Sequence, residues 1–429
     1  FEDLGLIIMD EEQEHTYKAE NKPRFHAREL AKFRCNFNNC TLLLSSATPD
    51  VRSFYYAQSG RYTLHTLSER FGGAALPDVQ VVDMNDELSR GNTTGFSNYL
   101  LESLEQTLEE GKQAILLLNR RGFNTFATCK SCKEAVTCPN CSISMTYHSA
   151  NNRLMCHYCG HSVYFTDKCP TCSSSGLRLS GTGTQKAEQV LADFLPNARI
   201  LRLDADAVMA KNSHEKLLTA FGKGEYDILI GTQMVAKGLD FPDVTLVGVI
   251  SVDQQLYNDD FRSTERTFDL LTQVVGRSGR GEKEGRAVIQ TLAPENAVIE
   301  LSAQQDYKEF YETEIGIRKG LAYPPYCDLC AITFVGNGES NVMFAAKNFF
   351  SLFKERLLEK YKDEKVVVLG PVAPKVGKIS NKYRQRLIIK CKNSSHFRAF
   401  IAECLKEFST YKVYNNITVY ADMNPDSLY

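Results

Sequence analysis

Eight of the 14 cysteines in this chain form four Cys-x-x-Cys pairs in one segment: Cys129/Cys132, Cys138/Cys141, Cys156/Cys159 and Cys169/Cys172. A two-residue spacer lets both thiolates of a pair reach one tetrahedral zinc ion at about 2.3 Å. The periodicity of the neighbouring helices and strands disappears in this segment, so it cannot build a sufficient core alone. A structural zinc supplies roughly 10–16 kcal/mol in small finger peptides. The pattern therefore predicts a metal-stabilised insertion over 129–172, with redox dithiols or an iron–sulfur cluster as alternatives.

Eight thiolates suffice for two closed sites of four cysteines each, so we expect two structural Zn²⁺ ions. The nearby histidines are expected at the surface rather than as ligands, since the thiolates already complete both sites. The six cysteines outside the segment do not form such a cluster, since Cys327/Cys330 is a single pair far from the others, and they are expected in the core. The assigned ligands are Cys129, Cys132, Cys169 and Cys172 for the first zinc, and Cys138, Cys141, Cys156 and Cys159 for the second.

The 429 residues are 43% hydrophobic and 24% charged, an ordinary mix for a folded protein. At roughly 100–200 residues per domain, this length predicts two to four domains. The 50 Lys and Arg nearly balance the 52 Asp and Glu, so nucleic-acid contacts require local basic patches. No apolar run approaches the roughly 20 residues of a membrane span, and clustered cysteines favour a reducing cytoplasm. Because the chain opens at Phe1, we expect a fragment or a processed chain.

Short apolar runs alternate with helix-like segments over the first 300 residues, as in Ala114–Leu118 and Val244–Ile250. This alternation is typical of α/β folds whose parallel sheets are covered on both faces. Beyond Leu301 the order βαββαβ predicts a split βαβ domain. From Val366 onward, ten Lys and Arg face four Asp and Glu, so this part is locally basic. The expected parts are 1–70, a linker at 71–96, a domain of 97–128 and 173–300, the insertion 129–172, and a basic α+β domain at 301–429.

Four motifs stand at the ends of the expected strands and helices. The run Leu6–Met9 ends in Asp10-Glu11-Glu12, and paired acids at a strand end can hold Mg²⁺ and activate water. Alone this signal is weak, because acidic turns after strands are common. Three further motifs follow in order: Ser45-Ser46-Ala47-Thr48 after Thr41–Leu44, Gly231–Phe241, and Gln273–Arg280, whose two arginines suit a polyphosphate.

The order of these motifs resembles that of superfamily 2 helicases. The eight-cysteine insertion, preceded by Leu118–Phe123 and followed by Gly181–Thr184, narrows the resemblance to the PriA family of bacterial replication-restart DNA helicases. The resemblance implies RecA-like lobes, with a partial lobe 1 at 1–70 and a complete lobe 2 that carries the zinc insertion. An RNA helicase with a zinc insertion is a weaker interpretation, because the whole motif order fits the restart family.

The resemblance also implies ATP with Mg²⁺ as cofactor and assigns roles by position. Asp10 would bind Mg²⁺ and Glu11 would be the general base. Gln13 stands where the family usually has His, yet its amide can still donate and accept hydrogen bonds. The sequence contains no G-x-x-x-x-G-K-[ST], so we expect this chain alone to hydrolyse ATP negligibly. The remaining assignments are Ser46 and Thr48 for coupling hydrolysis to DNA, Gly238 and Asp240 for sensing nucleotide, and Gln273, Arg277 and Arg280 for the γ-phosphate.

The family resemblance predicts DNA contacts in an aromatic-rich loop after the acids, before the insertion, and on the basic C-terminal domain. For the loop and the C-terminal residues, an ordinary surface loop and a solvated sheet edge remain alternatives. The predicted contact residues are Tyr17, Lys18, Phe25, Arg28, Arg120, Arg121, Lys382, Tyr383 and Arg384.

The implied function is ATP-dependent 3′→5′ unwinding at stalled or branched replication forks, with primosome assembly for replication restart. Implied partners are forked and single-stranded DNA, single-strand-binding protein, other primosome proteins and the replicative helicase loader. We expect a monomer in the bacterial cytoplasm at the nucleoid, without membrane contact. The alternative from another class is a fork-binding assembly platform that works without ATP.

Overall fold

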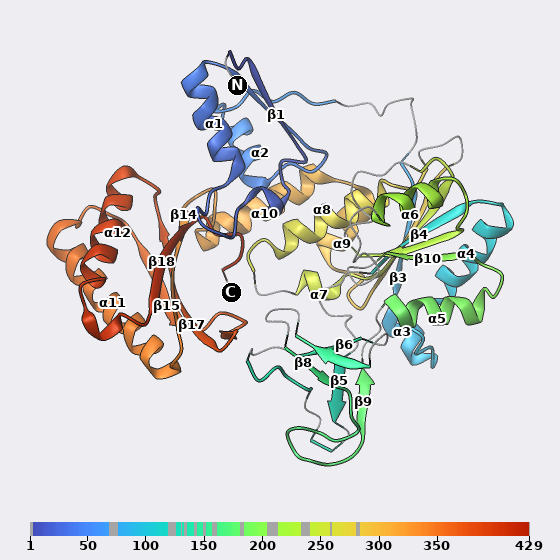
Figure 1. Cartoon of the computed structure of the whole chain (residues 1–429). Coiled ribbons are helices and arrows are strands. Elements are labelled where there is room, and N and C mark those ends of the chain that lie inside the picture. The colour runs from blue at the N-terminus through green and yellow to red at the C-terminus, as the bar shows by residue number, and fades with distance from the viewer. Residues whose placement is uncertain are drawn as a thin grey trace. The chain divides into compact units, whose positions relative to one another are not determined.

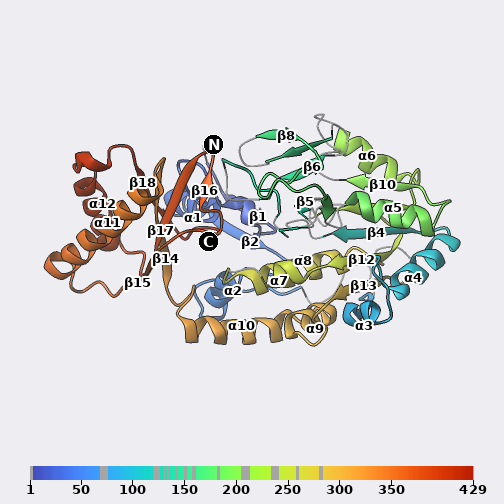
Figure 2. The ribbon, with the colours of Figure 1, turned by 90° about the horizontal axis from the view of Figure 1, so that it is seen from below.

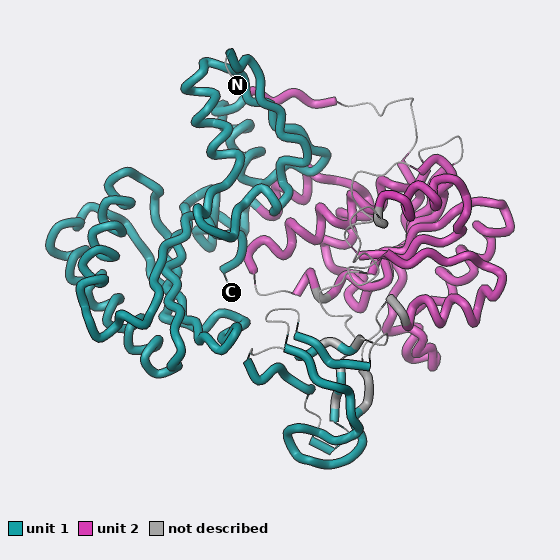
Figure 3. Tube along the Cα trace, viewed as in Figure 1, with its two compact units in different colours: residues 1–62, 126–179, 315–429 teal, residues 63–125, 180–314 magenta. Residues whose placement is uncertain are grey.

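In the computed structural model the chain folds into two compact units (Figure 3). Unit 1 comprises residues 1–62, 126–179 and 315–429, and unit 2 comprises 63–125 and 180–314. No helix among the described residues is long and apolar enough to cross a membrane. The described residues are 3–67, 76–118, 126–129, 131–132, 135–140, 144–148, 152–156, 161–180, 184–203, 213–232, 241–257, 260–279 and 284–428.

Unit 2 is built on a six-stranded parallel sheet in the order β10-β11-β4-β12-β13-β3. Its central strand β4 reads QAILLL and is buried along its whole length. Such a continuous apolar run is what a parallel strand covered on both faces requires. The strands are β3 (Asp78–Asp83), β4 (Gln113–Leu118), β10 (Ile200–Leu203), β11 (Ile228–Gly231), β12 (Val244–Ser251) and β13 (Arg286–Thr291).

Alternate residues of β4 enter two different cores, one on each face of this sheet. Ile115 and Leu117 belong to one hydrophobic cluster, whereas Leu116 and Leu118 belong to the other. Helices therefore cover both faces, which confirms the expected α/β class (Figures 1 and 2). The helices of unit 2 are α3 (Met84–Ser89), α4 (Asn98–Glu109), α5 (Thr184–Phe194), α6 (Ser213–Gly222), α7 (Asp253–Leu256), α8 (Ser263–Val275) and α9 (Ala297–Gln304).

Part of the segment expected as a linker at 71–96 is regular structure. Residues 78–83 form β3, the edge strand that pairs in parallel with β13, and 84–89 form α3. The sequence did not predict this strand, because β3 is only half-buried and carries an aspartate at each end. Such a pattern lacks the continuous apolar run of the central strands.

The first part of unit 1 is a parallel pair, β1 (Leu6–Asp10) and β2 (Thr41–Ser45), in the register Asp10↔Ser45. Helices α1 (Ala27–Asn38) and α2 (Val51–Gln58) accompany it, and the 3-10 turn η1 (His15–Tyr17) lies between β1 and α1 in the chain. The parallel register brings the ends of both strands, and hence the acid and Ser-Ala-Thr motifs, to one sheet edge.

The C-terminal part of unit 1 is the predicted split βαβ domain. Its antiparallel sheet has the order β15-β17-β14-β18, with the short β16 beside β17. Both long helices cover one face and close an aromatic-rich core (Figures 1 and 2). After α10 (Tyr307–Leu321), the elements are β14 (Asp328–Gly336), α11 (Glu339–Lys360), β15 (Val367–Val372), β16 (Lys378–Ile379), β17 (Lys382–Cys391), α12 (Ser395–Phe408), η4 (Lys412–Tyr414) and β18 (Thr418–Met423).

The cysteine-rich part of unit 1 is a small sheet in the order β8-β7-β6-β5-β9. Its core contains four of the motif cysteines, Cys129, Cys138, Cys156 and Cys169. These strands were not expected, because strands this short leave almost no periodicity in a sequence. They are β5 (Phe126–Cys129), β6 (Thr146–His148), β7 (Arg153–Met155), β8 (Ser162–Tyr164) and β9 (Leu177–Ser180).

Candidate nucleotide, zinc and DNA sites

The acid motif continues directly from the end of β1. Asp10 is the last residue of the strand, and Glu11 turns the chain with a positive φ of 48°. A left-handed residue is uncommon outside glycine, and here it marks the point where the chain leaves the extended strand. Glu11 and Glu12 are adjacent in sequence, but their hydrogen bonds give them different surroundings.

Gln13 connects the acid motif to the Ser-Ala-Thr motif. Its Nε2 donates to Glu11 Oε2 at 2.7 Å, and its Oε1 accepts from Ser46 Oγ at 2.6 Å. Ser46 Oγ in turn accepts from the backbone N–H of Thr48 at 2.9 Å. An amide can donate on one side and accept on the other, so Gln13 can do what we expected despite its departure from the family's His. The result is a continuous hydrogen-bonded path from Glu11 to Thr48.

Glu12 lies in a buried polar cluster instead of facing a nucleotide. Its carboxylate accepts from Arg28 Nη1 at 2.5 Å, from Ser53 Oγ at 3.0 Å and from the Asp50 N–H at 2.9 Å. Burial raises the pKa of Glu12, the nearby Asp50 carboxylate adds to the rise, and Arg28 opposes it. Sequence reasoning gave Glu12 no role of its own, because Arg28 and Ser53, its partners, lie 16 and 41 residues further along the chain.

Two of the predicted DNA contacts in the following loop are buried in ion pairs. Arg28 is 7% exposed and bonds Glu12, and Lys18, also 7% exposed, bonds Asp422 Oδ1 at 2.7 Å. Their charges are neutralised inside the protein, so the expectation of DNA contact is corrected for both. Phe25 is 41% exposed, and the half-buried Tyr17 donates through its hydroxyl to Asp10 O at 2.8 Å. For these two aromatic residues, contact with DNA stays a prediction.

The second half of the predicted nucleotide site belongs to unit 2. Gln273 lies in the last turn of α8, and Arg277 follows the helix end, with its N–H bonded to Val274 O at 3.0 Å. Both side chains are partly exposed. The predicted Gly238, Asp240 and Arg280, and the predicted DNA contacts Arg120 and Arg121, lie outside the described residues.

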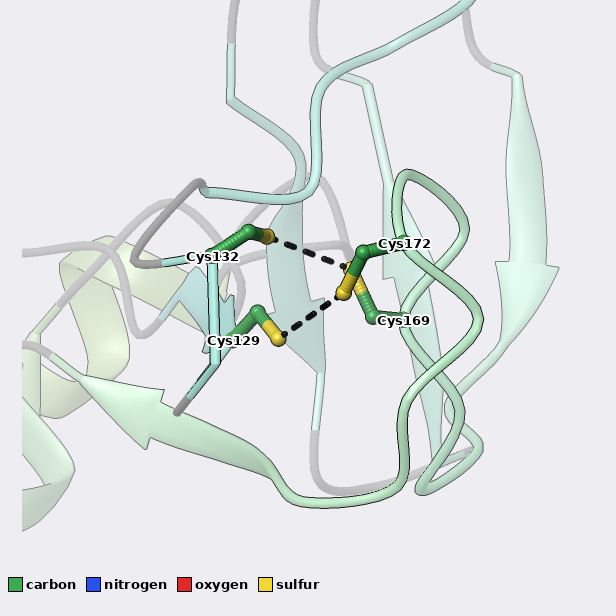
Figure 4. A group of neighbouring side chains, drawn as sticks. All are labelled: Cys129, Cys132, Cys169 and Cys172. Atoms are coloured by element: carbon green, nitrogen blue, oxygen red, sulfur yellow. Dashed lines mark hydrogen bonds between the residues drawn. The ribbon is translucent and has the colours of Figure 1, made fainter.

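The first predicted zinc site is assembled as expected (Figure 4). The sulfur atoms of Cys129, Cys132, Cys169 and Cys172 all lie within 4.8 Å of one another. Sγ–Sγ distances are 3.6 Å for Cys129–Cys172 and 3.8 Å for Cys132–Cys169. Four sulfurs at about 2.3 Å from one tetrahedral ion stand about 3.8 Å apart, so the group fits zinc. The Ser174 hydroxyl, with backbone N–H groups, lowers the pKa of Cys129 to about 6, which favours the thiolate ligand.

The second site is described in part. Cys138 and Cys156 are buried in one core, whereas Cys141 and Cys159 lie outside the described residues. Cys138 Sγ accepts from the Asn140 N–H at 3.4 Å, just as Cys129 Sγ accepts from the Ser131 N–H at 3.3 Å. The turns after Cys129 and Cys138 therefore share this contact, which supports a metal-ligand role for Cys138.

The predicted basic contact on the C-terminal domain begins β17. Lys382 is exposed, whereas Tyr383 and Arg384 are half-buried. The Lys378 ammonium lies over the Tyr383 ring at 5.3 Å. Ser380 and Asn381, with φ of 48° and 62°, form the hairpin turn. A turn with two left-handed residues suits a two-residue hairpin loop, and it displays Lys382 beside the half-buried Tyr383.

Comparisons with known proteins place the chain in a family. Three family profiles match it: PriA DNA helicase Cys-rich region (CRR) domain at 138–163, Helicase conserved C-terminal domain at 180–282, and Primosomal protein N C-terminal domain at 319–426. The Replication restart protein PriA of Bacillus subtilis is 44% identical over 425 residues, which are 99% of this chain and 52% of that protein. The chain belongs to the PriA family. The PriA protein of Synechocystis is 40% identical, over 90% of the chain and 47% of its own length.

The chain thus spans about half the length of these curated PriA relatives. Among solved structures, the structure of RecG bound to a three-way DNA junction is similar with a TM-score of 0.39 and 15% identity. The match covers 73% of this chain and 30% of the RecG chain. The family match confirms the resemblance drawn from the motif order. The Cys-rich profile begins at Cys138, and the helicase profile contains Gln273 and Arg277.

Proposed function

We propose that the protein is an ATP-dependent 3′→5′ DNA helicase that recognises stalled or branched replication forks. In this proposal it initiates primosome assembly for replication restart in the bacterial cytoplasm. The observation that supports a motor is the hydrogen-bonded path Glu11–Gln13–Ser46. A chain that had lost hydrolysis would have no chemical need for this path between a general base and a hydroxyl motif. The PriA relatives support the replication-restart role.

In the proposed mechanism, Asp10 holds Mg²⁺, which would neutralise charge on the ATP phosphates when both are bound. Glu11 accepts the proton of the attacking water. Gln13 orients the Glu11 carboxylate through the 2.7 Å hydrogen bond. Its second hydrogen bond, to Ser46, couples the position of that carboxylate to the Ser-Ala-Thr motif. Arg277 and Arg280 would stabilise the charge of the transferred phosphoryl group, which guanidinium forks suit. Gln273 would contact the γ-phosphate, and Gly238 and Asp240 would sense the nucleotide.

Two structural zinc ions hold the Cys-rich part in this proposal. A closed site of four cysteines contributes folding energy and offers no open position for catalysis. DNA contacts are assigned to Tyr17 and Phe25 in the loop, to Arg120 and Arg121, and to the β17 hairpin with Lys382, Tyr383 and Arg384. Single-strand-binding protein, primosome proteins and the helicase loader are the proposed protein partners of a monomer.

The test is ATP hydrolysis by the complete gene product, with and without forked DNA. Arg277→Ala removes a guanidinium proposed to stabilise the transferred phosphoryl group, and Arg90→Ala is the matched control at an exposed arginine of unit 2. Fork-stimulated hydrolysis that Arg277→Ala abolishes and Arg90→Ala retains would establish the motor. Tight fork binding without any hydrolysis would instead favour the assembly platform. The present chain alone is expected to bind DNA but to hydrolyse ATP negligibly.

A further inference from the structure

One end of the C-terminal sheet carries two acids on neighbouring strands. Asp328 begins β14, and Asp422 lies near the end of β18. The antiparallel register Ala331↔Asp422 and Cys330↔Met423 places the start of β14 beside the end of β18. Asn424 Nδ2 donates to Asp328 Oδ1 at 3.0 Å and joins the two strand ends. Two carboxylates thus lie at the same edge of this sheet, where β14 begins and β18 ends.

Lys18 ties the loop after the acid motif to this edge. Its ammonium, with 5% of the side chain exposed, donates to Asp422 Oδ1 at 2.7 Å, Met423 O at 3.2 Å and Arg24 O at 3.2 Å. All three of its N–H donors are therefore used. A buried ammonium costs several kcal/mol unless a charge and further acceptors compensate it. The loop is therefore held to β18 by a specific site and not by loose packing.

The same loop makes a second contact with β18. The Arg24 guanidinium stacks on the Tyr420 ring at 3.8 Å from its centroid. Tyr420 and Asp422 are two residues apart, so they lie on the same face of β18. Inside the loop, Lys18 and His26 form an antiparallel bridge, and the Ala19 N–H bonds Phe25 O at 2.8 Å. The loop thus docks as one folded hairpin.

The Ser-Ala-Thr side is anchored at the neighbouring acid. Arg52, in the first turn of α2, donates to Asp328 Oδ1 at 2.9 Å, and the Tyr55 and Tyr326 rings lie 5.4 Å apart. Helix α2 follows the motif directly, and its N-cap Asp50 accepts from the Arg52 and Ser53 N–H groups. Asp422 and Asp328 therefore hold the segments that follow the two hydrolysis motifs.

One hydrogen bond connects the docked loop to Asp10, the proposed Mg²⁺ ligand. Tyr17, next to Lys18, donates its hydroxyl to Asp10 O at 2.8 Å. We propose that the Asp328–Asp422 edge of the C-terminal domain is a positioning clamp for the hydrolysis motifs, with Lys18 and Arg52 as its partners. Through it, DNA bound on the C-terminal domain would act on the alignment of Asp10 and Glu11. This inference rests on the proposed function, since it assigns a positioning role within the same ATPase.

Amide hydrogen exchange of this chain tests the clamp without any ATPase readout. Asp422→Asn removes the charge that pairs with Lys18, and Asp363→Asn is the matched control at an exposed aspartate of the same domain. We expect exchange in residues 14–26 to rise about tenfold or more for Asp422→Asn alone, because the stranded ammonium destabilises the docked loop. Exchange in α11 should stay unchanged. Unchanged exchange in 14–26 would overturn the clamp.

Steady-state kinetics of the complete gene product test whether the clamp positions the motifs. We expect Asp422→Asn and Asp328→Asn each to lower fork-stimulated kcat about fivefold or more. Neither should change the Kd for forked DNA by more than about twofold. A fall in kcat that merely follows the folded fraction or the DNA affinity would overturn the positioning role. If the wild type shows no fork-stimulated hydrolysis, the proposed motor fails, whereas the exchange experiment still decides whether the clamp exists.

Discussion

The buried pair of Glu12 and Arg28 gives the sharpest test of the structure. The Glu12 side chain is 2% exposed and that of Arg28 is 8% exposed. Arg28→Met keeps most of the side-chain volume but leaves the Glu12 carboxylate without its cation. Breaking one partner of a buried pair costs about 3–5 kcal/mol, because a desolvated charge stays behind. Ser53 and the Asp50 N–H still donate to this carboxylate, so the loss should lie near the lower end.

Local amide exchange in α1 is the appropriate assay, since the chain has several domains and no Trp. A loss of about 3 kcal/mol corresponds to a roughly hundredfold larger population of the open state, and so to exchange that is faster by the same factor. The double variant Arg28→Met with Glu12→Leu removes both charges and should recover much of that loss, because an apolar pair of similar volume avoids the desolvation cost. Exchange in unit 2 serves as the internal control.

The pH dependence of the Arg28→Met variant provides an independent check. The folded pKa of Glu12 is raised above its unfolded value by burial and by Asp50. The stability contribution of such a group is full below its unfolded pKa and is lost as the pH rises through its folded pKa. Arg28→Met removes the charge that opposes this rise, so the folded pKa of Glu12 rises further in the variant. The loss of stability relative to the wild type should therefore be smaller at pH 5 than at pH 8. A loss under about 1 kcal/mol, or a double variant no better than the single one, would refute the buried-pair reasoning.

Three further outcomes follow from other parts of the chain. Metal analysis should find two zinc ions per chain, falling to one in Cys132→Ser but not in the control Cys40→Ser. Burial and the Arg28 charge lower the pKa of His26 to about 4, and protonation blocks the Nδ1 atom that accepts the helix-cap hydrogen bond from the Arg28 N–H. The start of α1 should therefore lose stability as the pH falls from 6.5 toward 4. Exchange at the Arg28 amide measures this loss, and His26→Asn should remove its pH dependence. Gly248→Ala should cost about 1–3 kcal/mol, since its Cβ would stand 2.6 Å from Leu116 Cδ2; an unchanged thermal midpoint would contradict that packing.

The central strands of unit 2 were predictable because burial on both faces leaves an unbroken apolar run. The expected strand Ala114–Leu118 corresponds to β4 (Gln113–Leu118), and Val244–Ile250 corresponds to β12 (Val244–Ser251). The order of strands in the sheet was not predictable in this way. It depends on which crossovers bury the helix faces, and a one-dimensional pattern does not contain that information.

The zinc ligands were predictable for a different reason. A Cys-x-x-Cys spacing constrains geometry locally, and only a few ways of combining four pairs exist. The grouping of Cys129 with Cys172 is present in the structure. The contact between Asn381 N–H and Asn140 O at 2.8 Å, which joins the β17 hairpin to the Cys138 turn, had no such local signal.

The misassigned cations show where sequence reasoning fails at this site. Lys18 and Arg28 stand among aromatic residues after a nucleotide motif, and such residues are typical of phosphate contacts. A sequence displays the charge but not its partner, and both partners are far away in sequence or point in an unexpected direction. Asp422 lies 404 residues after Lys18, and Glu12 resembles a catalytic acid until its surroundings are known. A basic side chain contributes to DNA affinity by releasing counterions only while its charge remains exposed. The loop's contribution to DNA binding is therefore expected to come from the exposed ring of Phe25 rather than from these two cations.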